Sequence, residues 1–358
     1  MKGLILSGGK GTRLRPLTYT RAKQLIPLAN KPVLVRVIET IRDAGVSEIG
    51  IVVGGSTAAE IEETLSDGSQ WGVQLTFIHQ DSPDGLAHAV KISEDFLQDD
   101  SFVMFLGDNA IEGGISQLIR DFESHSWNSQ IVLKRVANPS SYGVASLRDD
   151  NSVDYLVEKP QDPPSNLALV GIYMFDKHIF EAVHAIKPSD RGELEITDAI
   201  QWLINNEYSV FPHVHDGWWV DTGKAPDLLE ANSYVLSELV PERAGNTEID
   251  EQSTVDARVT VQAGAKIINS IVRGPTIIGE NAIIENSYVG PFTSVYNDVV
   301  VRNCEIERCI LLENSEVKNI DVMLRDSLIG RHASVKSNKE MKPRGVVMNV
   351  ADNSTLWI

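Results

Sequence analysis

Apolar residues recur every six positions over the last third of the chain, in three consecutive runs. A period of six fits neither an α-helix, which repeats every ~3.6 residues, nor a plain strand, which repeats every ~2. Three such hexads complete one triangular coil of a parallel β-helix, with each apolar residue pointing into the prism. The runs are Val255, Val261 and Ile267; Ile271, Ile277, Ile283, Val289, Val295 and Val301; and Leu311, Val317, Met323, Ile329 and Val335.

This part of the chain resembles the left-handed β-helix of hexapeptide-repeat proteins, although the small residue that the family places in each hexad is often missing. We therefore predict a β-helix over residues 251–336, preceded by a linker at 241–250. The tail at 337–358 is polar, with Trp357 near its end, and its pattern assigns it no place. Flat faces and exposed coil ends favour self-association, so we expect a homo-oligomer.

Residues 1–240 alternate between strand and helix patterns. Such alternation predicts an α/β domain with a doubly wound, mostly parallel sheet of the Rossmann-like kind. Ligands of these sheets bind at the carboxyl ends of the strands. The expected strands after the first are 49–53, 74–79 and 102–106, and the expected helices include 33–44 and 86–97.

The amino-terminal strand opens into a glycine-rich turn that contains Gly8, Gly9 and Gly11, with Thr12 and Arg13 directly after them. Glycines let backbone N–H groups approach a ligand, and a neighbouring cation suits phosphate oxygens. An ordinary strand-to-helix turn with a surface arginine explains this stretch equally well. The spacing matches neither the P-loop nor the dinucleotide fingerprint, which weakens a kinase or dehydrogenase assignment.

The bulk composition excludes several classes of protein. Fifty acidic residues against 32 basic give a formal charge of −18, which argues against nucleic acid as a partner. A phosphate site in this negative field would gain from bound Mg²⁺. No apolar run approaches the ~20 residues of a membrane span, and no signal peptide is evident, so we expect a cytoplasmic protein without membrane partners. Cys304 and Cys309 make a poor zinc site and are expected to be reduced structural thiols.

Four side chains outside the glycine turn are candidates for chemistry. Lys23 could reach the phosphates as a point charge, although a solvated surface lysine is the commoner case. Gln80 carries an amide donor and an acceptor that could pair with a pyrimidine edge, unless it is a simple turn residue. Asp108 ends a buried strand and Asp221 precedes a glycine turn; together they could bind one hard cation, and singly each could be a cap or turn residue.

Taken together, the motifs resemble the glucose-1-phosphate thymidylyltransferases in order and spacing over residues 1–240. The appended β-helix resembles the long form of that family. The blocks that narrow the resemblance most are S-P-D-G-L-A and R-G-E-L-E-I-T-D. The full set is G-G-x-G-T-R-L-x-P, K-Q-L-I-P, Q-x-S-P-D-G-L-A, L-G-D-N, Y-G-V, E-K-P, R-G-E-L-E-I-T-D and W-x-D-T-G.

The resemblance implies a role for each matching residue. Glucose 1-phosphate would attack the α-phosphorus of dTTP, giving dTDP-glucose and pyrophosphate. Arg13 and Lys23 would be catalytic and hold the triphosphate, and Asp108 and Asp221 would bind Mg²⁺. Nucleotide contacts would come from Gly8, Gly9, Gly11, Thr12, Gln24, Gln80, Pro83, Gly85 and Asp108. Contacts to the sugar phosphate would come from Asn109, Tyr142, Gly143, Glu158, Lys159, Val170, Gly171, Arg191 and Trp219.

Three alternatives stay open at this point. The first is an enzyme that uses UTP. UTP differs from dTTP by one methyl and one hydroxyl, and a missing methyl contact discriminates by only ~1–3 kcal/mol. A bifunctional enzyme would use the β-helix for acyl transfer, with His332 as its only histidine. A non-catalytic nucleotide-sugar sensor would predict the loss of Arg13 or of a metal carboxylate, and all three residues are present.

Overall fold

The computed structural model describes residues 1–9 and 11–337, which fall into two compact units. The first unit comprises Met1–Lys10, Arg21–Leu25 and Val33–Asp221. The second comprises Gly11–Thr20, Ile26–Pro32 and Thr222–Ile358, so it contains stretches that the sequence pattern alone places in residues 1–240. The predicted tail beyond 337 lies outside the described residues. Within the described part, none of the helices is long and apolar enough to cross a membrane.

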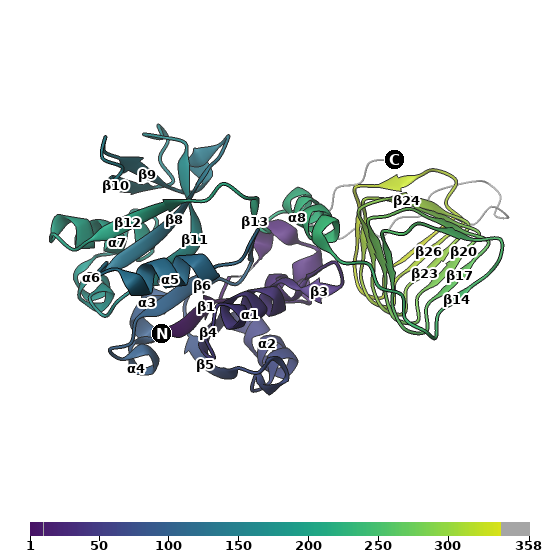
Figure 1. Cartoon of the computed structure of the whole chain (residues 1–358), viewed down its shortest axis with the longest axis horizontal. Helices are drawn as coiled ribbons and strands as arrows, with labels where there is room; N and C mark the ends of the chain where they lie inside the picture. The colour runs from purple at the N-terminus through teal and green to yellow at the C-terminus, as the bar shows by residue number, and fades with distance from the viewer. Residues whose placement is uncertain (10, 338–358) are drawn as a thin grey trace. The chain divides into compact units, whose positions relative to one another are not determined.

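A nine-stranded mixed sheet forms the centre of the first unit (Figure 1). Its parallel part has the order β6-β1-β4-β5, and all three expected strands lie in it. The four strands of this parallel part are β1 (Lys2–Leu6), β4 (Glu48–Gly54), β5 (Gln74–Gln80) and β6 (Phe102–Leu106). The remaining strands of the sheet are β8 (Ser129–Arg135), β9 (Gly143–Leu147), β10 (Val153–Glu158), β11 (Leu167–Phe175) and β12 (Val210–Val214). Beyond β6 the pairings are antiparallel, except that β12 lies parallel to β8.

Helices cover both faces of this sheet, as expected of a doubly wound fold. One buried cluster includes apolar residues of α1, α2 and α5, and a second includes residues of α3, α6 and α7. The predicted helix at 86–97 is two helices, because the chain breaks at Ser93, whose hydroxyl bonds the Ala89 carbonyl at 2.7 Å. The bounds are α1 Val33–Asp43, α2 Ala58–Leu65, α3 Leu86–Ile92, α4 Glu94–Leu97, α5 Ser116–Ser124, α6 Ile179–Ala185 and α7 Ile196–Asn205.

The second unit is built on a left-handed parallel β-helix whose three sheets form the faces of a prism. Five strands of the first face, β14, β17, β20, β23 and β26, lie side by side in Figure 1. That face is completed by β29 and runs β14 (Glu248–Ile249), β17 (Lys266–Ile268), β20 (Ile283–Glu285), β23 (Val300–Arg302), β26 (Glu316–Lys318), β29 (Ser334–Lys336). The second is β15 (Thr254–Val255), β18 (Ile271–Val272), β21 (Tyr288–Val289), β24 (Glu305–Glu307), β27 (Leu324–Arg325). The third is β16 (Val259–Val261), β19 (Thr276–Ile278), β22 (Thr293–Val295), β25 (Ile310–Leu311), β28 (Leu328–Ile329).

Four of the predicted inward positions of the β-helix are wrong by one residue. Ile271 is 40% exposed and Met323 is 39% exposed, whereas Val272 and the partly buried Leu324 pack in the prism. Ile277 and Ile283 likewise stand beside the true inward residues, Ile278 and Ile284. The register pairs Val255 with Val272 and Val272 with Val289, so the first coils take 17 residues rather than 18.

The corners of the coils explain the asparagines between the strands. One corner stacks Asn269, Asn286, Asn303 and Asn319, all with φ between +45° and +59°. Asparagine tolerates this left-handed conformation better than most residues do. The side chain of Asn269 also donates to Asn286 at 2.7 Å, and that of Asn303 donates to Asn319 at 2.7 Å. The asparagines therefore hold successive coils in register.

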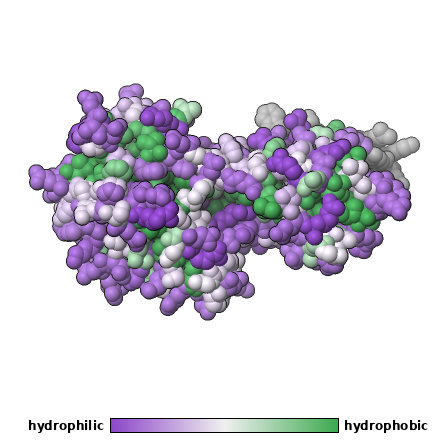
Figure 2. Space-filling model, viewed as in Figure 1, coloured by the Kyte–Doolittle hydropathy of each residue, from purple (hydrophilic) through white to green (hydrophobic). Residues whose placement is uncertain are grey.

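Three other segments join the β-helix in the second unit: residues 11–20, a short hairpin and α8 (Ala225–Glu238). The hairpin consists of β2 (Pro27–Leu28) and β3 (Lys31–Pro32). Its Asn30 side chain donates to the Val295 carbonyl at 2.8 Å, which ties the hairpin to β22. On the face shown in Figure 2, hydrophilic residues predominate, in keeping with the excess of acidic residues.

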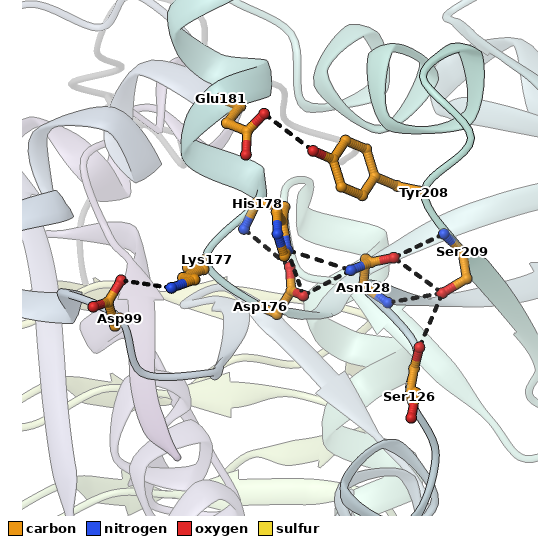
Figure 3. A network of polar contacts seen from close by, with 9 residues as sticks. All are labelled: Asp99, Ser126, Asn128, Asp176, Lys177, His178, Glu181, Tyr208 and Ser209. Carbon is orange, nitrogen blue, oxygen red and sulfur yellow. Dashed lines mark hydrogen bonds and ion pairs between the residues drawn. The ribbon is translucent and has the colours of Figure 1, made fainter.

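A polar network ties the end of β11 to the segments before β8 and β12 (Figure 3). Asn128 donates to Asp176 at 2.8 Å and accepts from the Ser209 backbone at 2.9 Å, while Tyr208 donates to Glu181 at 3.0 Å. A shallow hollow of about 350 Å³ beside this network includes Glu181 and Lys177 in its lining. Because Phe175 of β11 pairs with Phe102 at the start of β6, the network lies at the amino ends of the parallel strands.

Candidate functional site

The turns that follow β1 and β6 lie next to each other, because these strands are parallel neighbours. Leu6 pairs with Leu106, and the Gly107 N–H donates to the Leu6 carbonyl at 2.9 Å. A Cβ atom on Gly107 would lie 3.1 Å from that carbonyl, so the close approach favours glycine. Gly8 and Gly9 therefore lie beside Asp108, at the carboxyl edge where such sheets bind ligands.

Asp221 reaches the same place from far along the chain. The strand β13 (Trp219–Asp221) pairs antiparallel with β7 (Asn109–Ile111), and Asp221 lies opposite Asn109. Asp108 precedes Asn109 and is 8% exposed. Two carboxylates at adjoining positions fit Mg²⁺, which takes one or two protein carboxylates and keeps waters and substrate phosphates as its other ligands. Among the described residues no cluster of three or more such ligands occurs, and this cation does not need one.

Lys23 pairs with Asp108 through its ammonium group. It stands on the short 3₁₀ turn η3 (Lys23–Leu25), and its side chain is 13% exposed. Burial raises the pKa of Asp108, but the Lys23 charge and hydrogen bond outweigh burial and hold that pKa below its usual range. A Cβ on Gly9 would lie 3.2 Å from Lys23 Cε, so the glycine makes room for the lysine. The ion pair therefore places one cation and one carboxylate side by side at the candidate site.

The remainder of the glycine turn belongs to the second unit. Gly11, with φ +62°, precedes the 3₁₀ turn η1 (Thr12–Leu14), which contains Arg13. The Thr18 hydroxyl donates to the Gly11 carbonyl at 2.7 Å and fixes the turn. Arg13 lies near Asp227 of α8. Burial raises the pKa of Asp227, and the charge of Arg13 offsets part of that rise. The triphosphate role of Thr12 and Arg13 stays a prediction.

The candidate nucleotide side chains lie around Ser7 and Gly8. Gln24 is 1% exposed, and its Nε2 donates to the Ser7 carbonyl at 3.2 Å. Gln80, at the end of β5, contacts His88 and Gly85 through its amide nitrogen. Pro83 is exposed in the turn between them. His88 was not among the predicted residues, and the only signal for it in the sequence is its place directly after Leu86-Ala87.

Gly85 is required where it stands. Its φ is +107°, and a Cβ atom would lie 2.3 Å from the Leu194 carbonyl. That carbonyl accepts from the Ala87 N–H at 3.0 Å, and the Leu194 N–H donates to the Asp84 carbonyl at 2.7 Å. The two motif blocks that narrowed the resemblance therefore pack directly on each other.

Aromatic and glycine residues form the candidate sugar region. Tyr142 and Trp219 meet edge to face at 5.3 Å, and the Trp219 indole donates to Asn109 Oδ1 at 2.7 Å. Asn109 in turn donates to Asp108 Oδ1 at 3.0 Å, so it links the indole ring to the candidate metal ligand Asp108. Gly171, with φ +77°, marks an irregularity in β11 and lets Leu106 pack close. Val170 is fully buried in the core, so only its backbone could meet a sugar.

Glu158 lies between the two candidate cations for the sugar phosphate. Lys159 approaches it at 3.2 Å and Arg191 at 3.4 Å, and Gly143 pairs with it across β9 and β10. Lys159 has a left-handed φ of +41°, a conformation that is costly for lysine and often found at functional sites. Burial and the Glu158 charge raise the pKa of Glu195, which also accepts from Ser189.

The carboxylates, cations and glycine turns gathered at this sheet edge suit the class of enzyme that binds phosphate groups. The chain belongs to the nucleotidyl transferase family, whose model matches residues 2–238.

Two relatives cover nearly the whole chain. It is 49% identical to the glucose-1-phosphate thymidylyltransferase of Streptomyces griseus over 358 residues, 100% of this chain and 99% of that one. It is 44% identical to a low-salt glycan biosynthesis nucleotidyltransferase of Haloferax volcanii, over 99% of both chains.

Solved structures resemble the catalytic part. A Bacillus anthracis protein assigned as a glucose-1-phosphate thymidylyltransferase, crystallised with sucrose, matches with a TM-score of 0.62 at 33% identity. That match covers 65% of this chain and 94% of the other. A UDP-glucose pyrophosphorylase complex with UDP-glucose matches at 0.59, with 24% identity and 66% and 99% coverage, and it bears on the fold alone.

Proposed function

We propose that this enzyme transfers the thymidylyl group of dTTP to glucose 1-phosphate, giving dTDP-glucose and pyrophosphate. The observation that carries the proposal is the meeting of Lys23, Asp108 and Asp221 at one sheet edge, beside the Tyr142–Trp219 pair. One relative with that printed name spans the full chain at 49% identity, and another spans 94% of it at 48% identity. The family's substrates are a nucleoside triphosphate and a sugar 1-phosphate; dTTP and glucose are the finer choice.

The reaction needs positioning and charge neutralisation more than a covalent nucleophile. The sugar phosphate is already ionised near pH 7, so no general base has to activate it. Lys159 and Arg191 would bind that phosphate. Before it binds, Glu158 would keep both cations oriented. Lys23 would exchange Asp108 for the triphosphate, and Arg13 would hold the phosphates with it.

The metal most consistent with these donors is Mg²⁺, held by Asp108 and Asp221. When bound, it would supply positive charge to the phosphate oxygens during transfer. Asn109 would orient the Asp108 carboxylate from its other side, because its amide nitrogen donates to Oδ1 at 3.0 Å. Chelation with EDTA should therefore stop turnover, and added Mg²⁺ should restore it.

A screen of four nucleoside triphosphates against several sugar 1-phosphates, followed by pyrophosphate release, tests the proposal. We expect dTTP with glucose 1-phosphate to give the highest kcat/KM. A preference for UTP at matched concentration would refute the choice of nucleotide. No pyrophosphate with any pair would refute transfer itself and favour a sensor.

The acyltransferase alternative gains nothing from the position of His332. That residue has φ +55° and its N–H donates to the Glu313 carbonyl at 3.1 Å. Asn281, Asp298 and Asn314 occupy the same corner in the coils before it, with φ between +55° and +58°. The histidine therefore has a structural reason to be where it is.

Homo-oligomer assembly and a cytoplasmic location stay predictions.

A further inference from the structure

The side chain of His88 touches the glutamine expected to face the nucleobase. His88 lies on α3, and its Nδ1 is 3.0 Å from Gln80 Nε2. The same Nε2 donates to the Gly85 carbonyl at 3.4 Å. A carbonyl oxygen can only accept, so the end of the Gln80 amide that faces Gly85 is the nitrogen end.

Both hydrogens of that amide nitrogen are therefore engaged within the protein. One points to the Gly85 carbonyl and the other to His88. An amide nitrogen does not accept hydrogen bonds, so His88 Nδ1 must be the acceptor, and the proton of the neutral ring is on Nε2. Gln80 has no hydrogen left to offer a ligand.

The opposite end of the amide faces the glycine turn. A Cβ atom on Gly8 would lie 3.0 Å from Gln80 Oε1, so this oxygen stands directly over the start of the turn. The turn is where the nucleotide is expected to bind. Gln80 thus presents an acceptor, and no donor, to the base.

We propose that His88 is a positioning residue that fixes Gln80 as a hydrogen-bond acceptor and so selects thymine or uracil against cytosine. This inference rests on the proposed function. Thymine and uracil carry an N3–H that an acceptor can receive, whereas cytosine has a bare N3 that needs a donor. A flipped amide would suit cytosine, but it would set Oε1 against the Gly85 carbonyl and would require the His88 ring to move its proton to Nδ1.

The test removes the acceptor on His88 without emptying its place. His88→Phe keeps a planar ring without a nitrogen, His88→Leu keeps apolar bulk, and His88→Asn retains an acceptor close to the position of Nδ1. We would measure kcat/KM with dTTP and with dCTP at saturating glucose 1-phosphate. We expect His88→Phe and His88→Leu to raise the dCTP-to-dTTP ratio ~10- to 100-fold, because a single buried hydrogen-bond mismatch is worth about that factor.

The result should appear in KM for the nucleotide, with KM for glucose 1-phosphate unchanged and His88→Asn close to the parent enzyme. An unchanged ratio in both His88→Phe and His88→Leu would overturn the inference, and so would an equal rise in His88→Asn. Calorimetric Kd values for dTTP and dCTP without the sugar phosphate give the same ratio independently of turnover. A parent enzyme that binds dTTP but makes no pyrophosphate would therefore refute the proposed function and leave this comparison readable.

Discussion

Asn232 should be among the residues whose loss costs the second unit most stability. It lies on α8 and is completely buried. Its Oδ1 accepts from the Ala29 N–H at 2.8 Å and from the Ser294 hydroxyl at 2.7 Å. Its Nδ2 donates to the Phe292 carbonyl at 3.2 Å. One side chain thus joins the hairpin, α8 and the β-helix.

Asn232→Ala would leave three polar groups in this junction without their partner. A buried group that loses its hydrogen bond costs ~1–3 kcal/mol, and the Ser294 hydroxyl can rotate to a new acceptor. We therefore expect the substitution to lower the free energy of unfolding of this unit by about 3–5 kcal/mol. For a unit of this size the melting temperature should fall by roughly 6–20 °C.

Calorimetry and native-state hydrogen exchange of α8 and β22 amides would measure the effect. Ser233→Ala is the matched control, because Ser233 bonds only its own helix, at the Leu229 carbonyl, and its loss should cost under ~1 kcal/mol. A cycle with Ser294→Ala should show a coupling of about 0.5–1.5 kcal/mol. If Asn232→Ala unfolds like Ser233→Ala, the junction does not depend on this side chain.

Three further outcomes can be checked. Asp108→Asn should abolish turnover while circular dichroism stays unchanged; full turnover would remove Asp108 from the site. Burial raises the pKa of Cys309 to about 11, so this thiol should resist thiol reagents at pH 8 until denaturant is added, and rapid labelling of the native protein would contradict its burial. Burial and, after it, the Glu158 charge raise the pKa of Asp198 above its value in the unfolded chain. The contribution of Asp198 to folding stability is therefore fully present below the unfolded pKa and is lost as the pH rises through the folded pKa. Asp198→Asn should therefore gain stability relative to the parent at pH 7 and lose that advantage near pH 4, as urea unfolding would show.

The strands and the edge of the sheet were predictable because each has a local signal. The strand Phe102–Leu106 has the bounds that its apolar run predicts, and Asp108 follows it. The pairing of β7 with β13 had no such signal. Asn109 and Asp221 stand more than a hundred residues apart, and only the register shows that they are neighbours.

The hexad pattern predicted the β-helix but misplaced part of it, for a physical reason. Ile271 and Val272 are both apolar, so spacing alone cannot tell which one points inward. The inward positions from Ile267 to Val289 are not evenly spaced by six, because the steps from Ile267 to Val272 and from Ile284 to Val289 are five residues long. The left-handed corner at Asn269 makes the first of these shorter steps possible.

Contacts between the β-helix and the amino-terminal segments of the second unit bear on what a truncated enzyme should do. If the β-helix served only self-association, deleting residues 246–358 would alter assembly more than chemistry. In the second unit, however, Arg331 donates to the Thr20 carbonyl at 2.6 Å, and the side chain of Asn30 bonds β22.

The segment that carries Thr12 and Arg13 therefore packs with the β-helix, and its predicted triphosphate contacts depend on that support. The truncated enzyme should show a raised KM for dTTP as well as altered assembly. The variant Arg331→Met should reproduce part of that rise while full-length assembly persists, because it removes the hydrogen bond to the Thr20 carbonyl. An unchanged KM for dTTP in both proteins would show that the segment holds its conformation without the β-helix.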